Sequence, residues 1–194
     1  NRHMLRDDKR LAGWHGLTLL TFSRAAQLTG EAQHQQSATQ LYRFISEKLW
    51  DGRYLRRTPE GEITELADYA YITAGIMEYA RLTGDEAHYR VCANLVEQAW
   101  QRFYIDGFWR RSENIELLLP YTVYPVTLPD NELLSPAATL ISVTLELGKF
   151  LEQRYTEHAQ LAQRTVDSNL VKSPFFYGTQ ITGWQTTHAN NKLH

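Results

Sequence analysis

This 194-residue chain has a single cysteine, no excess of positive charge and no long apolar run. Its one cysteine, Cys92, excludes an internal disulfide and any zinc cluster built from several cysteines, and it fits a reducing compartment. The formal net charge of -2 provides no basic field, so we expect no nucleic-acid partner. No apolar run approaches the length of a membrane span and no signal-peptide pattern opens the chain, so we expect no membrane contact and a cytoplasmic location.

Motifs that would identify several common enzyme classes are missing as well. The sequence has no glycine-rich phosphate loop, no serine nucleophile elbow and no Cys-x-x-Cys pair. We therefore expect no cofactor and no metal ion. His34, His88 and His158 recur near the starts of separate predicted helices, so we expect them at the solvated surface rather than around a metal.

Aromatic residues, in contrast, are abundant. They make up 12% of the chain and include five Trp and eleven Tyr. Aromatic side chains at this level either fill wide gaps between helices or line a groove for flat ligands such as sugars. The length fits one domain that is large enough to bury a core.

Hydrophobic periodicity predicts a succession of helices. Three prolines place a long loop between residues 113 and 134, and Ser135-Pro136 has the sequence of a helix start. The predicted helices cover residues 9–28, 31–50, 64–82, 85–103, a segment from 135 to about 151, and 156–170.

The first four of these helices form an internal repeat. Thr29-Gly30 and Thr83-Gly84 each end a helix and lie 54 positions apart, and Asp51-Gly52 and Asp106-Gly107 lie 55 positions apart. The repeated unit is a helix, a tight turn, a second helix and a short strand, with a small β-hairpin expected around residues 58–61. Such a unit cannot bury its own apolar face and must stack on its neighbours.

The fold class predicted from this repeat is all-α. We expect three helical hairpins with short β-hairpin connections, forming a partial (α/α)6 toroid over residues 1–172. A C-terminal tail, residues 173–194, is expected to be partly packed. This arrangement places the loops that lead into the inner helices at one end, where a toroid builds its pocket.

The segment from Leu5 to Leu17 carries the densest ionisable chemistry. Asp7 and Asp8 could supply an acid or base for sugar chemistry, which requires two carboxyl groups across a substrate. The alternative is that these carboxylates complement the helix dipole and pair with Lys9 or Arg10.

Four further positions join this candidate site. Trp14 could stack on a sugar ring and His15 could transfer protons near neutral pH. The alternative is that Trp14 packs between helices and that His15 bonds a neighbouring loop. Asp68 and Tyr69 begin the next inner helix and are expected to face the same cavity, with Ser135 across from them.

Several short motifs together resemble a known family. The motifs are Asp7-Asp8-Lys9, Trp14-x-Gly16-Leu17, the Leu-Thr-Gly that ends at Gly30, Leu49-Trp50-Asp51-Gly52 and Asp68-Tyr69-Ala70. In this order, over roughly residues 5–148, they resemble the C-terminal half of the spermatogenesis-associated, thioredoxin-like protein family. The resemblance implies a toroid similar to N-acylglucosamine 2-epimerases and six-hairpin glycosidases. It also implies two partners within the same protein, the missing toroid half and a thioredoxin-like domain.

Two functional hypotheses follow from these observations. The first is a carbohydrate-binding or carbohydrate-active pocket, which as an enzyme would be a sugar epimerase, an isomerase or a glycosidase. Its catalytic residues would be Asp7, Asp8, His15 and Asp68, and its ligand-binding residues would be Trp14, Lys9, Tyr69 and Ser135.

The second hypothesis is a non-catalytic helical scaffold attached to a thioredoxin-like domain. It is motivated by departures from the family pattern at His15, at Ala67 and at Ala137-Ala138. In either case a half-toroid exposes apolar flanks, so we expect this chain to self-associate.

Overall fold

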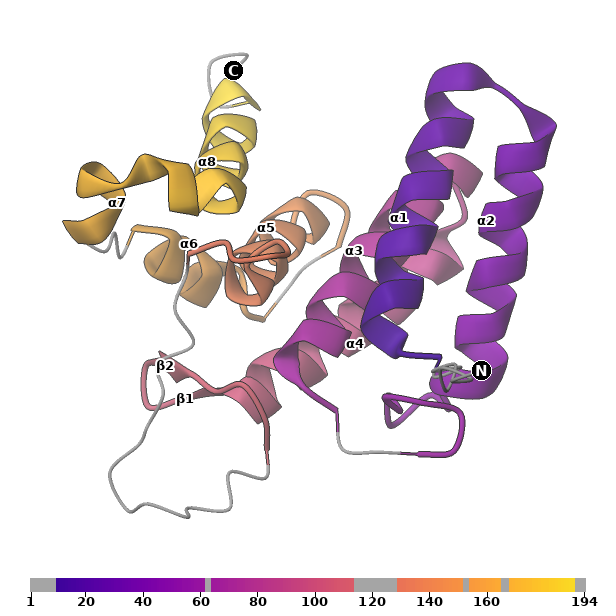
Figure 1. Ribbon diagram of the computed structural model, residues 1–194, viewed down its shortest axis with the longest axis horizontal. Helices are drawn as coiled ribbons and strands as arrows, with labels where there is room; N and C mark the ends of the chain where they lie inside the picture. Colours follow the sequence, from indigo (N-terminus) through magenta and orange to yellow (C-terminus); the bar gives the residue numbers. More distant parts are fainter. Residues whose placement is uncertain (1–9, 62–63, 114–128, 152–153, 165–167, 191–194) are drawn as a thin grey trace, which may run out of the picture.

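The computed structural model describes residues 10–61, 64–113, 129–151, 154–164 and 168–190, and these are mostly helical (Figure 1). The helices are α1 (Ala12–Thr29), α2 (Ala32–Phe44), α3 (Leu66–Thr83), α4 (Glu86–Phe103), α5 (Pro136–Leu147), α6 (Thr156–Arg164), α7 (Ser168–Lys172) and α8 (Gly178–Asn190). A π-helical turn, Ile45–Leu49, extends α2, and a 3-10 turn, Pro174–Tyr177, precedes α8. The two strands are β1 (Tyr104–Ile105) and β2 (Phe108–Trp109).

Three helical hairpins follow one another across the molecule. In Figure 1, α1 and α2 lie at one side, α3 and α4 come next, α5 and α6 follow, and α7 and α8 lie at the far side. The first helices of the hairpins contact each other in order, α1 with α3 and α3 with α5, and α8 then packs on α5. The predicted all-α architecture of stacked helical hairpins is therefore confirmed.

The most extensive contact between elements joins α1 and α3, and two glycines make it possible. A Cβ atom added to Gly16 would overlap the backbone of Tyr71 and Ile72, and one added to Gly75 would overlap the carbonyl of Gly16. The two helices thus approach so closely that backbone rests on backbone. Both glycines are in helices, where they disfavour helix formation relative to alanine, so packing is the reason for their presence.

The first helices of the hairpins, α1, α3 and α5, are the inner helices, and the second helices are the outer ones. The internal repeat includes the same hydrogen-bonding contact at the ends of α1 and α3. Thr29 Oγ1 lies 3.1 Å from His34 Nδ1, and in the second hairpin Thr83 Oγ1 lies 2.9 Å from His88 Nδ1. The glycine after each threonine ends its helix in the left-handed region, with φ of 69° and 67°. The expectation of solvated histidines is wrong for His34 and His88, which are partly buried against these turns, and His158 is exposed.

A second repeated contact holds the start of each inner helix. The backbone N–H of Ala12 donates to the carbonyl of Arg57 at 2.8 Å, and that of Leu66 donates to Arg111 at 2.9 Å. The second pair lies 54 positions after the first, because Leu66 follows Ala12 and Arg111 follows Arg57 by 54 positions. The chain that leaves each outer helix therefore returns to satisfy an N–H at the first turn of its own inner helix, where no intrahelical partner exists.

The short strands differ between the two repeats. β1 and β2 pair antiparallel, with Tyr104 opposite Trp109, around a turn in which Asp106 has φ of 53° and Gly107 φ of 85°. In the first repeat the pairing is a single bridge between Trp50 and Leu55. The hairpin expected around residues 58–61 is therefore wrong in position. The turn lies earlier, at residues 51–54, where Asp51 accepts the backbone N–H groups of Arg53 and Tyr54.

The third hairpin and the C-terminal segment combine an expected and an unexpected feature. Ser135 is the N-cap of α5, as predicted, and its Oγ accepts from the N–H of Ala138 at 3.3 Å. The predicted tail contains α8, a helix with too many Gly and Thr residues to show apolar periodicity. Much of the predicted long loop, residues 114–128, lies outside the described residues.

We predict that Gly16→Ala lowers the free energy of unfolding by about 2 kcal/mol, because backbone atoms cannot yield to the added methyl group. The loss should occur even though alanine favours helix more than glycine does. Urea denaturation measures it. The matched control is Thr18→Ala at an exposed position of α1, which should stay within about 0.5 kcal/mol of the wild type. Equal stability of Gly16→Ala and the wild type would contradict the backbone contact.

Candidate functional site

The residues predicted at the start of α1 are only partly within the described structure. Asp7, Asp8 and Lys9 lie outside the described residues. Trp14 is 61% exposed and so does not pack between helices. His15 is half-buried, its Nδ1 lies 2.9 Å from the carbonyl oxygen of Leu11, and its ring stacks on Phe44 with centroids 4.7 Å apart.

Asp68 joins the starts of α1 and α3. Its carboxylate accepts the backbone N–H of Glu65 at 3.0 Å and that of Gly13 at 3.1 Å, and Arg57 lies 3.4 Å away. Burial raises the pKa of Asp68, although the two N–H donors and Arg57 act in the opposite direction. The Asp68 residue is 4% exposed, so a solvated ligand has little access to its carboxylate.

Asp68 and Tyr69 face different parts of the molecule. The Tyr69 hydroxyl donates to Gln98 on α4 at 3.3 Å, its ring meets Phe103 edge-on, and burial raises its pKa to about 12. The hydroxyl of Tyr71 reaches the carbonyl of Leu134 instead, near the start of α5. The two-residue spacing separates these rings onto different faces of α3.

Ser135 lies beside a carboxylate that connects two helix starts. Asp130 accepts the backbone N–H of Ser135 through Oδ1 at 2.8 Å and that of Thr179 through Oδ2, also at 2.8 Å. Both bonds go to donors at helix N-termini, where a negative charge is favoured. Asp130 thereby fixes the start of α8 next to the start of α5.

A cavity of about 380 Å³ lies between α1, α3, α5 and α8. Its lining is apolar in part and carries carboxylates, hydroxyls and one arginine. The lining residues are Leu20, Arg24, Ala74, Met77, Glu78, Asp130, Leu134, Thr139, Ser142, Val143, Glu146, Gly178, Thr179, Thr182 and Gly183. A volume of this size and a mixed lining are typical of small-molecule sites.

Two larger hollows are weaker candidates. One, of about 510 Å³, is lined by residues of α2 alone, and a single helix cannot enclose a ligand. The other, of about 530 Å³, lies between α4 and the segment before α6, and three of its seven lining residues, Arg90, Glu97 and Arg154, are charged and exposed. The cavity between the inner helices is therefore the candidate functional site.

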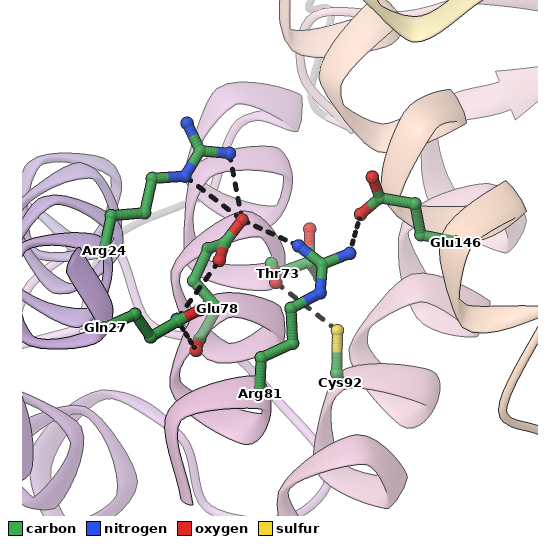
Figure 2. A network of polar contacts seen from close by, with 7 residues as sticks. All are labelled: Arg24, Gln27, Thr73, Glu78, Arg81, Cys92 and Glu146. Atoms are coloured by element: carbon green, nitrogen blue, oxygen red, sulfur yellow. Dashed lines mark hydrogen bonds and ion pairs between the residues drawn. The ribbon is translucent and has the colours of Figure 1, made fainter. Parts of the chain in front are cut away.

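A four-residue ionic network borders this cavity (Figure 2). Glu78 Oε1 accepts from Arg24 Nη2 at 2.9 Å and from Arg81 Nη1 at 2.8 Å, and Arg81 Nη2 donates to Glu146 Oε2 at 2.7 Å. Burial alone would lower the pKa of Arg81, but the carboxylates of Glu146 and Glu78 raise it. Two arginines balance two glutamates, so the buried Glu78 carboxylate is paired, as a buried charge must be.

The internal repeat relates the members of this network, although they match no known motif. Arg24 and Glu78 are 54 positions apart, as are Gln27 and Arg81. Gln27 Nε2 of α1 donates to the Glu78 carbonyl of α3 at 3.2 Å, and Arg81 of α3 bonds Glu146 of α5. Equivalent positions of α1 and α3 thus each contact a glutamate of the next inner helix. Equivalent positions in the two repeats therefore meet in space, and a residue-by-residue alignment of the repeats is the sequence signal that identifies them.

Two hydroxyls in the cavity lining are buried and have no hydrogen-bond partner. They are Thr139 Oγ1 and Thr179 Oγ1, and Thr139 is 6% exposed. A buried hydroxyl without a partner costs free energy unless a ligand or water bonds it. Both threonines line the cavity, but their hydroxyl oxygens have almost no accessible surface, so a ligand would reach them only after a side-chain rotation.

Other chemistries find no support in the described part of the chain. No cluster of three or more His, Cys, Asp or Glu residues there could hold a metal ion. Cys92 is fully buried, it donates to the carbonyl of Thr73 at 3.4 Å, and burial strongly raises its pKa. None of the described helices is both long enough and apolar enough to span a bilayer.

Comparison with known proteins defines the class of fold. No family model matches the sequence, and no curated protein matches it significantly. Among solved structures, a sugar epimerase from a ruminal bacterium superposes with a TM-score of 0.64 at 17% identity, covering 83% of this chain and 44% of that one. Cellobiose 2-epimerase from Bacillus thermoamylovorans gives 0.65 at 13% identity, covering 84% and 45%.

A third structure extends this set. Cellobiose 2-epimerase from Spirochaeta thermophila gives a TM-score of 0.57 at 17% identity, covering 80% of this chain and 43% of that one. The chain has the α/α toroid fold of these proteins and spans less than half of their length. At identities of 13–17%, these superpositions show the fold alone.

We predict that Glu78→Ala lowers the free energy of unfolding by about 2–3 kcal/mol, because two arginines then share no carboxylate. The estimate is moderated because Arg24 is largely exposed. Glu86→Ala is the control, since its pair with Arg90 is fully at the surface and should contribute under about 0.5 kcal/mol. Chemical denaturation of both variants checks the difference, and equal losses would contradict the network's role.

We also predict a pH-dependent effect of Asp68→Asn. Because the pKa of Asp68 is raised on folding, the folded state binds its proton more tightly than the unfolded state. The contribution of Asp68 to stability therefore grows as the pH falls through the folded pKa. The stability of wild type relative to Asp68→Asn should rise between pH of about 7 and about 4. Denaturation curves at several pH values measure this, and an opposite slope would show that the donors outweigh burial.

Proposed function

We propose that this chain is part of a carbohydrate-binding toroid and that a sugar occupies the cavity between α1, α3, α5 and α8. The observation that carries the proposal is a cavity of about 380 Å³ whose lining joins apolar side chains to carboxylates and hydroxyl-bearing residues, among them Thr139. Sugars bind through hydroxyl hydrogen bonds and apolar ring faces, and the cavity offers both kinds of surface.

The fold similarity supports the same substrate class. The similar solved structures are a sugar epimerase and two cellobiose 2-epimerases, so a neutral mono- or disaccharide is the ligand to test first. Epimerase, isomerase or glycosidase activity and kinship with the spermatogenesis-associated, thioredoxin-like family remain parts of this proposal. Catalytic roles for Asp7, Asp8, His15 and Asp68 also remain predictions.

The three carboxylates that line the cavity differ in how many of their hydrogen bonds are already made within the protein, and so in how readily they could act as an acid or base. Glu78 is held by two arginines and Asp130 by two backbone donors, so both are committed to structural bonds. Glu146 is bound by Arg81 through Oε2 and is only partly buried. We propose Glu146 as the carboxylate in this cavity with most freedom to contact a sugar.

We predict that cellobiose and its constituent monosaccharide raise the thermal unfolding midpoint of the protein. Ligand at about 100 times its Kd stabilises the folded state by about 2.7 kcal/mol, which thermal-shift measurement detects. Thr139→Val should weaken this shift, because it removes the hydroxyl with little change in volume. The control is Thr58→Val, which removes a buried hydroxyl without a partner outside the cavity.

Two outcomes would contradict the proposal. One is the absence of a shift with any mono- or disaccharide, which would favour the alternative of a non-catalytic scaffold. The other is a shift that Thr139→Val leaves unchanged, which would place the sugar elsewhere on the molecule.

A further inference from the structure

One face of α5 forms a stripe along the cavity. The stripe consists of Thr139, Ser142, Val143 and Glu146, which follow the three- and four-residue spacing of a single helix face. Ser142 and Glu146 are both half-buried, whereas the Thr139 hydroxyl oxygen is almost fully enclosed. The stripe therefore presents one hydroxyl and one carboxylate to the cavity, a helical turn apart.

At both positions α5 departs from the pattern of the other inner helices. The residue six positions before the glycine that follows the helix is Arg24 in α1, Glu78 in α3 and Ser142 in α5, and all three line the cavity. The residue four positions later is a leucine in α1 and in α3, but it is Glu146 in α5. The repeated packing of the hairpins thus does not by itself account for a serine and a glutamate at these places.

Ser142 lacks the kind of partner that its equivalents have. Arg24 and Glu78 bond each other at 2.9 Å across α1 and α3. Ser142 instead faces a glycine of α8, because a Cβ atom added to Gly183 would lie 2.5 Å from Ser142 Oγ. Among the described residues, Ser142 Oγ has no hydrogen-bond partner, so this hydroxyl remains available to a ligand.

Glu146 has one oxygen engaged and one available. Arg81 Nη2 donates to Glu146 Oε2 at 2.7 Å, and Figure 2 shows the arginine between this carboxylate and Glu78. Within the described part of the chain, Glu146 Oε1 accepts no hydrogen bond. An ionised carboxylate only accepts, so Oε1 is suited to the O–H group of a sugar, which donates.

We propose that Ser142 and Glu146 together bind two adjacent hydroxyl groups of one sugar ring, so that the site recognises a 1,2-diol. The inference rests on the proposed function, because it takes the sugar to occupy this cavity. Cβ atoms one turn apart on a helix are separated by about 5–6 Å, and each O–H···O bond spans about 2.7–2.8 Å. Neighbouring ring hydroxyls fit between two such groups, with Glu146 accepting from one and Ser142 donating to or accepting from the other.

The dissociation constants of glucose and cellobiose, measured by isothermal titration calorimetry, test the pair. Ser142→Ala should raise them about 3–10-fold, because it removes one neutral hydrogen bond. Glu146→Gln should raise them about 10–100-fold, because it removes a charged acceptor of the same size. The control is Ser37→Ala on α2, which lies outside the cavity and should leave them unchanged. Ser142→Ala breaks no described hydrogen bond, so it keeps the test valid even if Glu146→Gln does not fold.

Monodeoxy analogues of glucose then identify the hydroxyls that are bound. Loss of either of two neighbouring hydroxyls should weaken binding to the wild type. Ser142→Ala should cause no further loss with one of these two analogues, and Glu146→Gln none with the other, because each variant and its analogue remove the same bond.

The outcomes separate this inference from the proposed function. Sugar binding that Ser142→Ala leaves unchanged would overturn the pair while the cavity remains the site, as would a loss confined to hydroxyls that are not adjacent. A wild-type protein that binds neither glucose nor cellobiose would overturn the proposed function, and the pair with it.

Discussion

The contact of backbone on backbone between α1 and α3 is the constraint on which the rest of the fold depends. Gly16 and Gly75 let the two helices approach further than any pair with side chains at these positions could. This approach brings the N–H of Gly13 onto Asp68 at one end and Arg24 onto Glu78 toward the other. The polar contacts of the helix pair are consequences of its spacing.

The two polar clusters have different physical characters. At the start of the helices, Asp68 is enclosed by backbone donors and has little contact with solvent. Toward their ends, Arg24 and Arg81 share the Glu78 carboxylate at the border of a cavity. The enclosed cluster fixes the pair of helices, whereas the open one leaves charged groups within reach of a ligand. The candidate site borders the open cluster, and its lining also includes Asp130 and Leu134 from the segment that leads into α5.

Local signals in the sequence predicted the helices and several of their boundaries. Thr29-Gly30 ends a helix because glycine adopts a left-handed conformation at little cost, and Ser135-Pro136 begins one through a side-chain cap and a fixed φ. Features set by distant residues were not predictable in this way. The burial of Asp68 depends on Gly13, 55 positions away, and the cavity depends on α8, whose sequence lacks apolar periodicity. The family resemblance predicted the toroid. Of the predicted site residues, the described ones, Trp14, His15, Asp68, Tyr69 and Ser135, are not among those that line this cavity.

The charge reversal between Arg24 and Glu78 has a consequence for the order in which the hairpins stack. These residues occupy the same position in two copies of one repeat, and in the folded protein they bond each other at 2.9 Å. Two identical repeats would bring like charges together at this point and repel. The two hairpins are therefore complementary rather than identical at this contact, and this difference favours one order of stacking. Exchanging the first hairpin for a duplicate of the second would place a glutamate opposite Glu78 and an arginine at the position of Gln27, whose amide lies 3.5 Å from the Glu78 carboxylate, so a different set of bonds would hold the stack.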